Sequence, residues 1–105
     1  MALTRSFRET IKEQMADAEF RREFLREAVS NMVAGDLETA KSVLREYING
    51  TLGFIALGAA LGKSPKSLMR MLAPDGNPQA RNLFEMVVHL QKVEGTVLEV
   101  QARAA

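Results

Sequence analysis

The chain has 105 residues, of which 47% are hydrophobic and 26% are charged, a balance typical of one globular domain with a packed core. It contains no cysteine, which excludes disulfides and cysteine-ligated zinc and agrees with a reducing compartment. The first residues lack the apolar stretch of a signal peptide, and the uncharged segment at residues 51–62 is shorter than the ~20 residues that span a bilayer. We therefore expect a cytoplasmic protein with no membrane segment.

Charge is distributed unevenly along the chain, although the net charge is only +1. The first fifty residues hold eight basic and nine acidic residues, whereas the remainder holds six basic and four acidic ones. Between Lys63 and Arg81 there are four cations and a single acid, Asp75. Because a local excess of positive charge attracts anionic partners, this stretch is where a nucleic-acid surface is expected.

Three amphipathic helices are predicted in the first half, because apolar residues recur there at spacings of three and four. The first ends near residue 17, the second covers 19–34, and the third runs from 37 to about 48. Gly35 and Asp36 separate the second from the third as C-terminal cap and N-cap. We interpret residues 1–50 as a helical extension packed on the core. The apolar positions of the first helix are Leu3, Phe7, Ile11 and Met15.

Two short helices, 52–61 and 65–72, and one longer helix are predicted in the second half. Ser64 is the expected N-cap of the second short helix, and Pro65 suits its first position. After a turn at 74–78, we expect Asn77 to cap the last helix and Pro78 to open it, with Glu94 and Gly95 at its end. Its predicted buried stripe is Leu83, Phe84, Val87, Val88 and Leu90.

Residues 96–101 (TVLEVQ) are rich in β-branched side chains, which predicts one short C-terminal strand or a frayed tail. We treat 95–105 as this strand or tail, and 51–94 as the functional region of a single domain. A lone strand needs a partner strand. The sequence therefore raises the hypothesis of a homodimer.

Two short helices joined by a three-residue turn with a glycine form the pattern of a helix-turn-helix. Such a motif needs a small residue at the closest approach (Gly58) and a residue tolerant of positive φ in the turn (Gly62). It also needs apolar residues that bury the contact between the two helices. The residues assigned to motif packing are Leu57, Gly58, Leu61, Gly62, Leu68 and Met71.

The run LGKSPKSLMRMLAPDGNPQARNLFEMVVHLQ resembles the Cro/phage-repressor type of helix-turn-helix, specifically the addiction-module antidote (HigA-like antitoxin) family. The resemblance covers residues 51–92 and implies an all-α, multi-helix domain containing a lambda-repressor-like helix-turn-helix. It also implies a second helix that enters the major groove of operator DNA, autorepression of a toxin-antitoxin operon, and a RelE-type toxin as a partner. The DNA-binding residues expected from it and from the charges are Lys63, Ser64, Pro65, Lys66, Ser67, Met69, Arg70 and Asn77.

Side-chain chemistry assigns different roles within this set. Lys63 and Lys66 suit phosphate, whereas the Arg70 guanidinium can donate to O6 and N7 of guanine together.

The segment from Gly58 to Ser64 resembles a P-loop but has one residue too few between its glycines. His89, the only histidine, lacks co-ligands for a metal and a partner for catalysis, so we expect a surface residue, no metal and no cofactor.

The sequence thus favours a sequence-specific DNA-binding transcriptional regulator, with an antitoxin-type autorepressor ahead of an orphan regulator that has no toxin. The alternative is a protein-interaction module whose helix-turn-helix no longer binds DNA. An enzyme is not expected, because convergent titratable groups are missing from the pattern.

Overall fold

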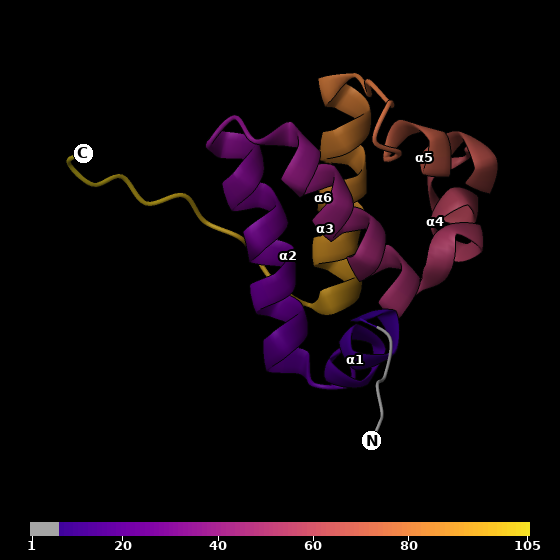
Figure 1. Cartoon of the computed structure of the whole chain (residues 1–105), viewed down its shortest axis with the longest axis horizontal. Coiled ribbons are helices and arrows are strands. Elements are labelled where there is room, and N and C mark those ends of the chain that lie inside the picture. The colour runs from indigo at the N-terminus through magenta and orange to yellow at the C-terminus, as the bar shows by residue number, and fades with distance from the viewer. Residues whose placement is uncertain (1–6) are drawn as a thin grey trace.

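The computed structural model describes residues 7–105, with side chains from residue 9 onward, and is all-α over that range (Figure 1). The expected position Leu3 and the side chain of Phe7 lie outside this description. No helix of the described chain combines the length and the apolar character needed to cross a membrane. The six helices of residues 7–105 are α1 (Phe7–Gln14), α2 (Ala18–Val33), α3 (Leu37–Gly50), α4 (Gly53–Leu61), α5 (Pro65–Met71) and α6 (Ala80–Glu94).

Helices α2 and α3 form a hairpin whose helix starts are set by two aspartates. The Asp17 carboxylate accepts a hydrogen bond from the backbone N–H of Glu19 at 2.9 Å, and Asp36 accepts one from Thr39 at 3.1 Å. Both are N-caps that satisfy donors left free in the first helical turn. Gly35, at φ +86°, reverses the chain between the helices. The predicted ranges 19–34 and 37–48 therefore differ from the observed helices only at their ends.

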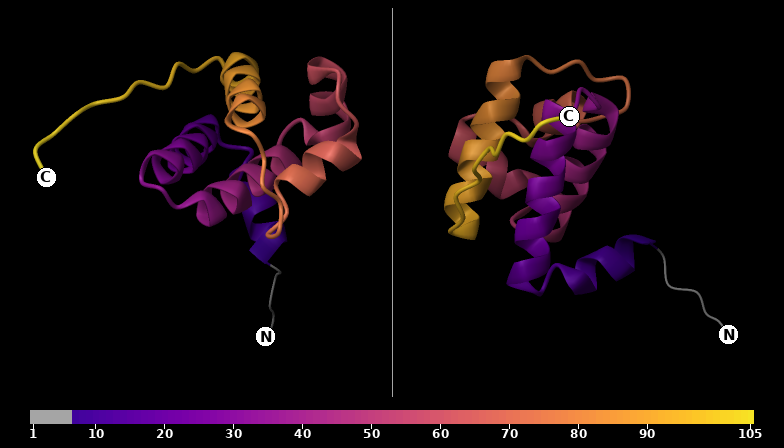
Figure 2. Two further views of the ribbon diagram at one scale, coloured as in Figure 1. Left: turned by 90° about the horizontal axis from the view of Figure 1, so that it is seen from above. Right: turned by 90° about the vertical axis from the view of Figure 1, so that its left-hand side faces the viewer.

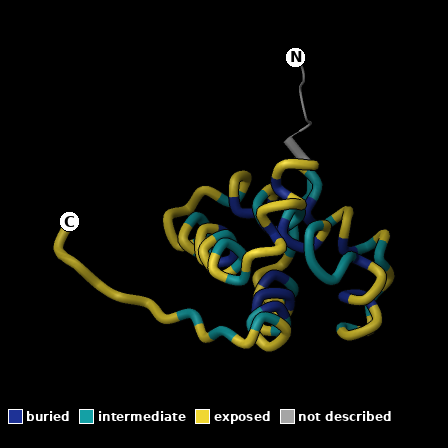
Figure 3. Tube along the Cα trace, turned by 90° about the horizontal axis from the view of Figure 1, so that it is seen from below, coloured by how far each residue is buried: buried dark blue, intermediate teal, exposed yellow. Residues whose placement is uncertain are grey.

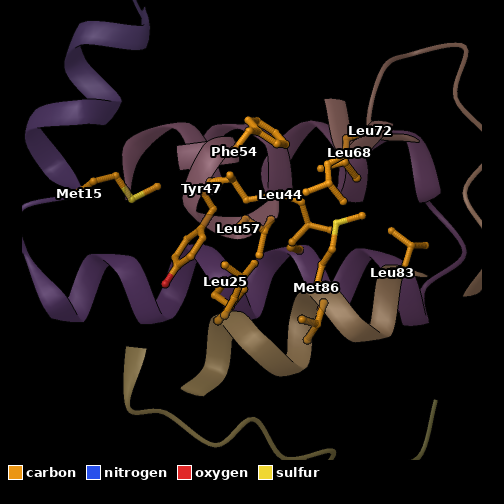
Figure 4. Packing of buried hydrophobic residues seen from close by; sticks show 14 of the residues in the cluster. Met15, Leu25, Leu44, Tyr47, Phe54, Leu57, Leu68, Leu72, Leu83 and Met86 are labelled. Carbon is orange, nitrogen blue, oxygen red and sulfur yellow. The ribbon is translucent and has the colours of Figure 1, made fainter. Parts of the chain in front are cut away.

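One hydrophobic core joins the N-terminal helices to α4, α5 and α6 (Figure 4). Helix α3 lies at its centre, since Ala40, Leu44, Tyr47 and Ile48 are all buried. The chain from residue 7 to residue 50 therefore supplies the middle of the core rather than an outer layer. The buried hydrophobic residues from the other helices and their junctions are Ile11, Met15, Leu25, Ala28, Phe54, Leu57, Leu68, Leu72, Leu83, Met86, Val87 and Leu90.

A partly buried polar cluster fastens α6 to α2 and α3. The Tyr47 hydroxyl donates to a carboxylate oxygen of Glu94, and Arg21 Nε donates to the same carboxylate at 3.0 Å. Arg21 also reaches the backbone carbonyl of Met15 at 2.8 Å, which ties in the end of the α1 segment. Burial, then the bond to Glu94, raises the pKa of Tyr47 above its ordinary range.

The predicted buried stripe of α6 is wrong at two positions. Phe84 and Val88 are 56% and 47% exposed, whereas Met86, which was not predicted, is completely buried. The buried residues Leu83, Met86, Val87 and Leu90 follow the i, i+3, i+4, i+7 spacing of a single helix face. Phe84 and Val88 lie one residue further along, about 100° around the helix, and so face away from the core.

The predicted start of α6 is also wrong. Neither Asn77 nor Pro78 belongs to the helix, which begins at Ala80 after an extended Gln79 (φ −68°, ψ 149°) with no side-chain cap. The physical reason is the preceding turn: two carbonyls of residues 74–76 are bound by Lys41 of α3. The chain must then cross from that turn to the start of α6 in extended form. The helix ends as expected, with Gly95 in the left-handed region at φ +68°.

The last ten residues leave the helical body on the side opposite α4 and α5 (Figure 2). Residues 7–105 contain no strand, and 96–105 are an extended tail that is exposed over most of its length (Figure 3). Gln91 holds the start of the tail against α6, because its side chain accepts a hydrogen bond from the Leu98 backbone N–H at 2.8 Å. Val97 and Val100 remain more than four-fifths exposed.

Candidate nucleic-acid interface

Helices α4 and α5 are joined by the turn Gly62-Lys63-Ser64, which gives the helix-turn-helix arrangement that the spacing predicts. Gly62 adopts the left-handed conformation at φ +68°, and the Lys63 N–H donates to the Gly58 carbonyl at 3.0 Å. Ser64 then caps α5 by accepting from the Ser67 N–H at 3.1 Å, with Pro65 as the first helical residue. Each turn residue thus meets a backbone requirement of its position.

Gly58 occupies the tightest point of this motif. A Cβ atom at residue 58 would lie 2.5 Å from the Lys63 carbonyl oxygen and 3.5 Å from Pro65 Cδ. The first of these neighbours is backbone, which cannot move without opening the turn. The close approach is therefore between α4 and the turn with the first residue of α5.

The four leucine and methionine positions assigned to motif packing all contact the core. Leu57 and Leu68 are completely buried, while Leu61 and Met71 are partly buried and pack against the same cluster. Figure 4 shows Leu57 and Leu68 among the core side chains contributed by the other helices. This packing fixes the angle between α4 and α5, so the outer face of α5 has a defined orientation.

The outer face of α5 carries Lys66, Met69 and Arg70, which are exposed and spaced i, i+3, i+4. Helix α5 contains no acidic residue. Lys63, in the turn, is more constrained: its side chain is 28% exposed and its ammonium lies 3.7 Å from a Glu85 carboxylate oxygen. Of the predicted cations, Lys66 and Arg70 are therefore the two that share an open surface.

The remaining predicted site residues divide into two groups. The hydroxyls of Ser64 and Ser67 bond each other at 2.9 Å, and Pro65 is partly buried, so these three residues build the start of α5. Asn77 is exposed and lines a hollow of about 370 Å³ together with Ser67 and Arg70. The single acid in that hollow is Asp75.

Sequence reasoning missed two cations of α3 that hold the far end of α5. Lys41 is 1% exposed and donates to the carbonyls of Pro74 at 3.2 Å and Gly76 at 2.6 Å. Arg45, one turn later, donates to the carbonyl of Leu72, the C-cap residue of α5. The sequence did contain a signal for the burial of Lys41, because this residue lies three positions before Leu44 and seven before Ile48, on the buried face of α3.

The described residues contain no group of three histidine, aspartate or glutamate side chains placed to hold a metal ion. His89 is partly buried and lies beside a groove between α4 and α6. Comparison of the chain with models of protein families, with curated proteins and with solved structures gave no match. The function is therefore inferred from the geometry and charge of this site and from the sequence pattern.

Proposed function

We propose that the chain is a sequence-specific transcriptional regulator that places α5 in the major groove of double-stranded operator DNA. The observation that carries the proposal is the outer face of α5, where Lys66, Met69 and Arg70 project from a short helix without acids. A major groove about 12 Å wide admits one helix, and a charged donor on that helix can reach base edges.

The two ends of α5 are fastened independently, which suits a helix that must keep its angle in a groove. Gly58 and the Ser64 cap hold the first end against α4, and Lys41 with Arg45 holds the last end against α3. Preorganised contacts of this kind reduce the ordering cost of binding. In this proposal Lys66 contacts phosphate and Arg70 reads guanine, with Lys63 as a further phosphate contact.

The finer proposal is an antitoxin-type autorepressor of a toxin-antitoxin operon that acts as a homodimer in the cytoplasm. Its support is the resemblance of residues 51–92 to the HigA-like antitoxins, together with the exposed tail as a dimer element. A RelE-type toxin is the corresponding partner. If a gene for such a toxin lies next to the chain's own gene, the antitoxin function is favoured over that of an orphan regulator.

A mobility-shift assay with the DNA upstream of the chain's own gene tests this function. We expect a shifted complex that survives excess scrambled duplex and disappears with excess unlabelled upstream DNA. Equal competition by both DNAs would reject sequence-specific regulation.

A second candidate function is a protein-interaction module whose helix-turn-helix does not bind DNA. The observation in its favour is the exposed Phe84 and Val88 on α6, because an aromatic side chain left in water on a helix face is typical of a contact surface. The absence of any DNA complex in the same assay, at low salt and high protein concentration, favours this candidate.

A further inference from the structure

A groove of about 710 Å³ runs between α4 and α6, on the side of the motif where neither Lys66 nor Arg70 lies. Its apolar lining includes Leu61 of α4 with Phe84 and Val88 of α6. Phe84 and Val88 are spaced i, i+4, so they form one continuous strip along the outside of α6. This strip is the part of α6 that the sequence assigned to the core.

The exposure of this strip is large for side chains of its kind. Phe84 is 56% and Val88 47% exposed, although four other apolar residues of the same helix are buried. About half of each of the two side chains therefore stays open to solvent. A phenylalanine and a valine four residues apart on a helix surface have the spacing of anchor residues that bind a second helix.

The charges around the strip have one predominant sign. Lys63, Arg81 and Lys92 line the groove, and Arg81 and Lys92 are exposed. Glu85 is the one acid of the lining, and its carboxylate lies 3.7 Å from the Lys63 ammonium. The groove thus combines an apolar centre with a cationic border, which is complementary to an apolar helix face bordered by acids.

We propose that this α4–α6 groove is a docking site for an acidic amphipathic helix of another protein. Two anchors at i, i+4 or i+7 on that helix would cover Phe84 and Val88, and its glutamates or aspartates would lie against Arg81 and Lys92. Charge argues against a second copy of this chain as the occupant. A two-fold contact places the same patch on both sides and would set cations against cations. The proposal does not depend on DNA binding.

The test uses a fluorescent helical peptide of about 16 residues, with leucines at i, i+3, i+4, i+7 and glutamates flanking them. Its control is the same peptide with every glutamate changed to lysine. Anisotropy titration against the full chain should show that the acidic peptide binds at least about tenfold tighter, with the difference shrinking at high salt.

Variants locate the binding. Phe84→Ser should weaken acidic-peptide binding about tenfold or more. Its matched control is Val93→Ser, an exposed valine of the same helix outside the groove, which should bind as wild type. Lys92→Glu should also weaken binding, whereas Arg22→Glu on α2 should not. Since all four side chains are on the outside, circular dichroism should show unchanged folding.

Three results would overturn the proposal. The first is equal affinity for the acidic and basic peptides, and the second is a Phe84→Ser variant that binds like Val93→Ser. The third is conversion of a dimer to a monomer by Phe84→Ser in light scattering, which would make a second copy the occupant of the groove.

Discussion

Gly58 lies where α4 has no room for a side chain. Replacing it with alanine would improve helix propensity by about 1 kcal/mol, but the new Cβ would lie 2.5 Å from the Lys63 carbonyl oxygen. Since that atom is backbone, we expect Gly58→Ala to lower the free energy of unfolding by about 1–3 kcal/mol, and Gly58→Leu by at least as much. Urea denaturation measures the change.

A second glycine provides the control for this prediction. At Gly50, the last residue of α3, an added Cβ would meet side-chain atoms of Met15, the nearest at 2.8 Å, and a methionine can change rotamer. Gly50→Ala should therefore cost less than Gly58→Ala. If Gly58→Ala is as stable as wild type, α4 and the turn are not in close contact.

Tyr47 gives the chain a specific response to alkaline pH. Burial, then the bond to Glu94, raises its pKa in the folded state above the ordinary value of about 10, although Arg21 acts in the opposite direction. Below pH ~10 the Tyr47 hydroxyl keeps its proton in both the folded and the unfolded state, so its contribution to stability is fully present. As the pH rises above ~10, the unfolded chain releases the proton first, so stability falls.

The Tyr47→Phe variant tests this pH dependence. It lacks the titrating hydroxyl and should lose about 0.5–1.5 kcal/mol near pH 7, because the bond to Glu94 is removed while Arg21 still pairs with that carboxylate. Thermal unfolding between pH 8 and 11 should show a shallower decline for the variant than for wild type. Parallel declines would contradict the assigned environment of Tyr47, the only tyrosine of the chain.

At the scale of elements, α3 controls the turn that follows α5 through a buried charge. The Lys41 ammonium bonds two carbonyls of residues 74–76 and lies 3.2 Å from a Glu38 carboxylate oxygen. Lys41→Met keeps the aliphatic stem but leaves those carbonyls without their donor. We expect a loss of at least about 2 kcal/mol in chemical denaturation.

The matched control for Lys41 is Lys12→Met, at an exposed position of α1, which should stay within about 0.5 kcal/mol of wild type. A small effect of Lys41→Met would mean that the turn at 74–76 holds its shape without α3.

The elements that the sequence predicts best are those with both a periodic apolar face and a local cap. Helices α2, α3 and α5 have aspartate or serine caps, and their predicted bounds are close to the observed ones. The start of α6 has no side-chain cap and is set by Lys41, a residue 39 positions earlier than Ala80, so local chemistry could not place it. The stripe of α6 was misassigned for a related reason. Apolar identity alone does not separate Phe84, on an open face, from Met86, on the packed one.

Much of the candidate site could also be predicted from sequence, because its residues lie within one short segment. Gly62, Ser64 and Pro65 satisfy local backbone requirements, which are readable from residue type. The contacts of Lys41 and Arg45 with the far end of α5 join residues about 30 positions apart, and the pairing of Lys63 with Glu85 crosses to another helix. Such contacts follow from tertiary packing.

At the scale of the whole molecule, one core connects the DNA-binding candidate surface to the N-terminal helices, while the tail lies on the opposite side (Figure 2). Val97 and Val100 of the tail are 82% and 84% exposed. Extended chain with exposed valines is suited to pairing with a second copy. We therefore predict a two-fold dimer through the tail.

Light scattering should give about twice the monomer mass of 11.6 kDa for the wild-type chain. The double variant Val97→Ser, Val100→Ser should be monomeric at the same concentration, because its apolar contacts across the tail are lost. The control Ile55→Ser changes an exposed apolar residue of α4, away from the tail, and should remain dimeric. A wild-type chain that stays monomeric at high micromolar concentration, free and with DNA, would reject the dimer.

The most direct test of the central claim compares Lys66→Ala and Arg70→Ala on operator and scrambled duplexes over a series of salt concentrations. If Lys66 neutralises a phosphate, its loss should weaken binding to both DNAs alike and lower the salt slope by ~1 per site. If Arg70 reads a guanine, its loss should cost about 1–3 kcal/mol per half-site on the operator and much less on the scrambled duplex. Arg22→Ala, an exposed cation on α2, should change neither quantity. If Lys66→Ala and Arg70→Ala both behave like Arg22→Ala, α5 does not bind DNA.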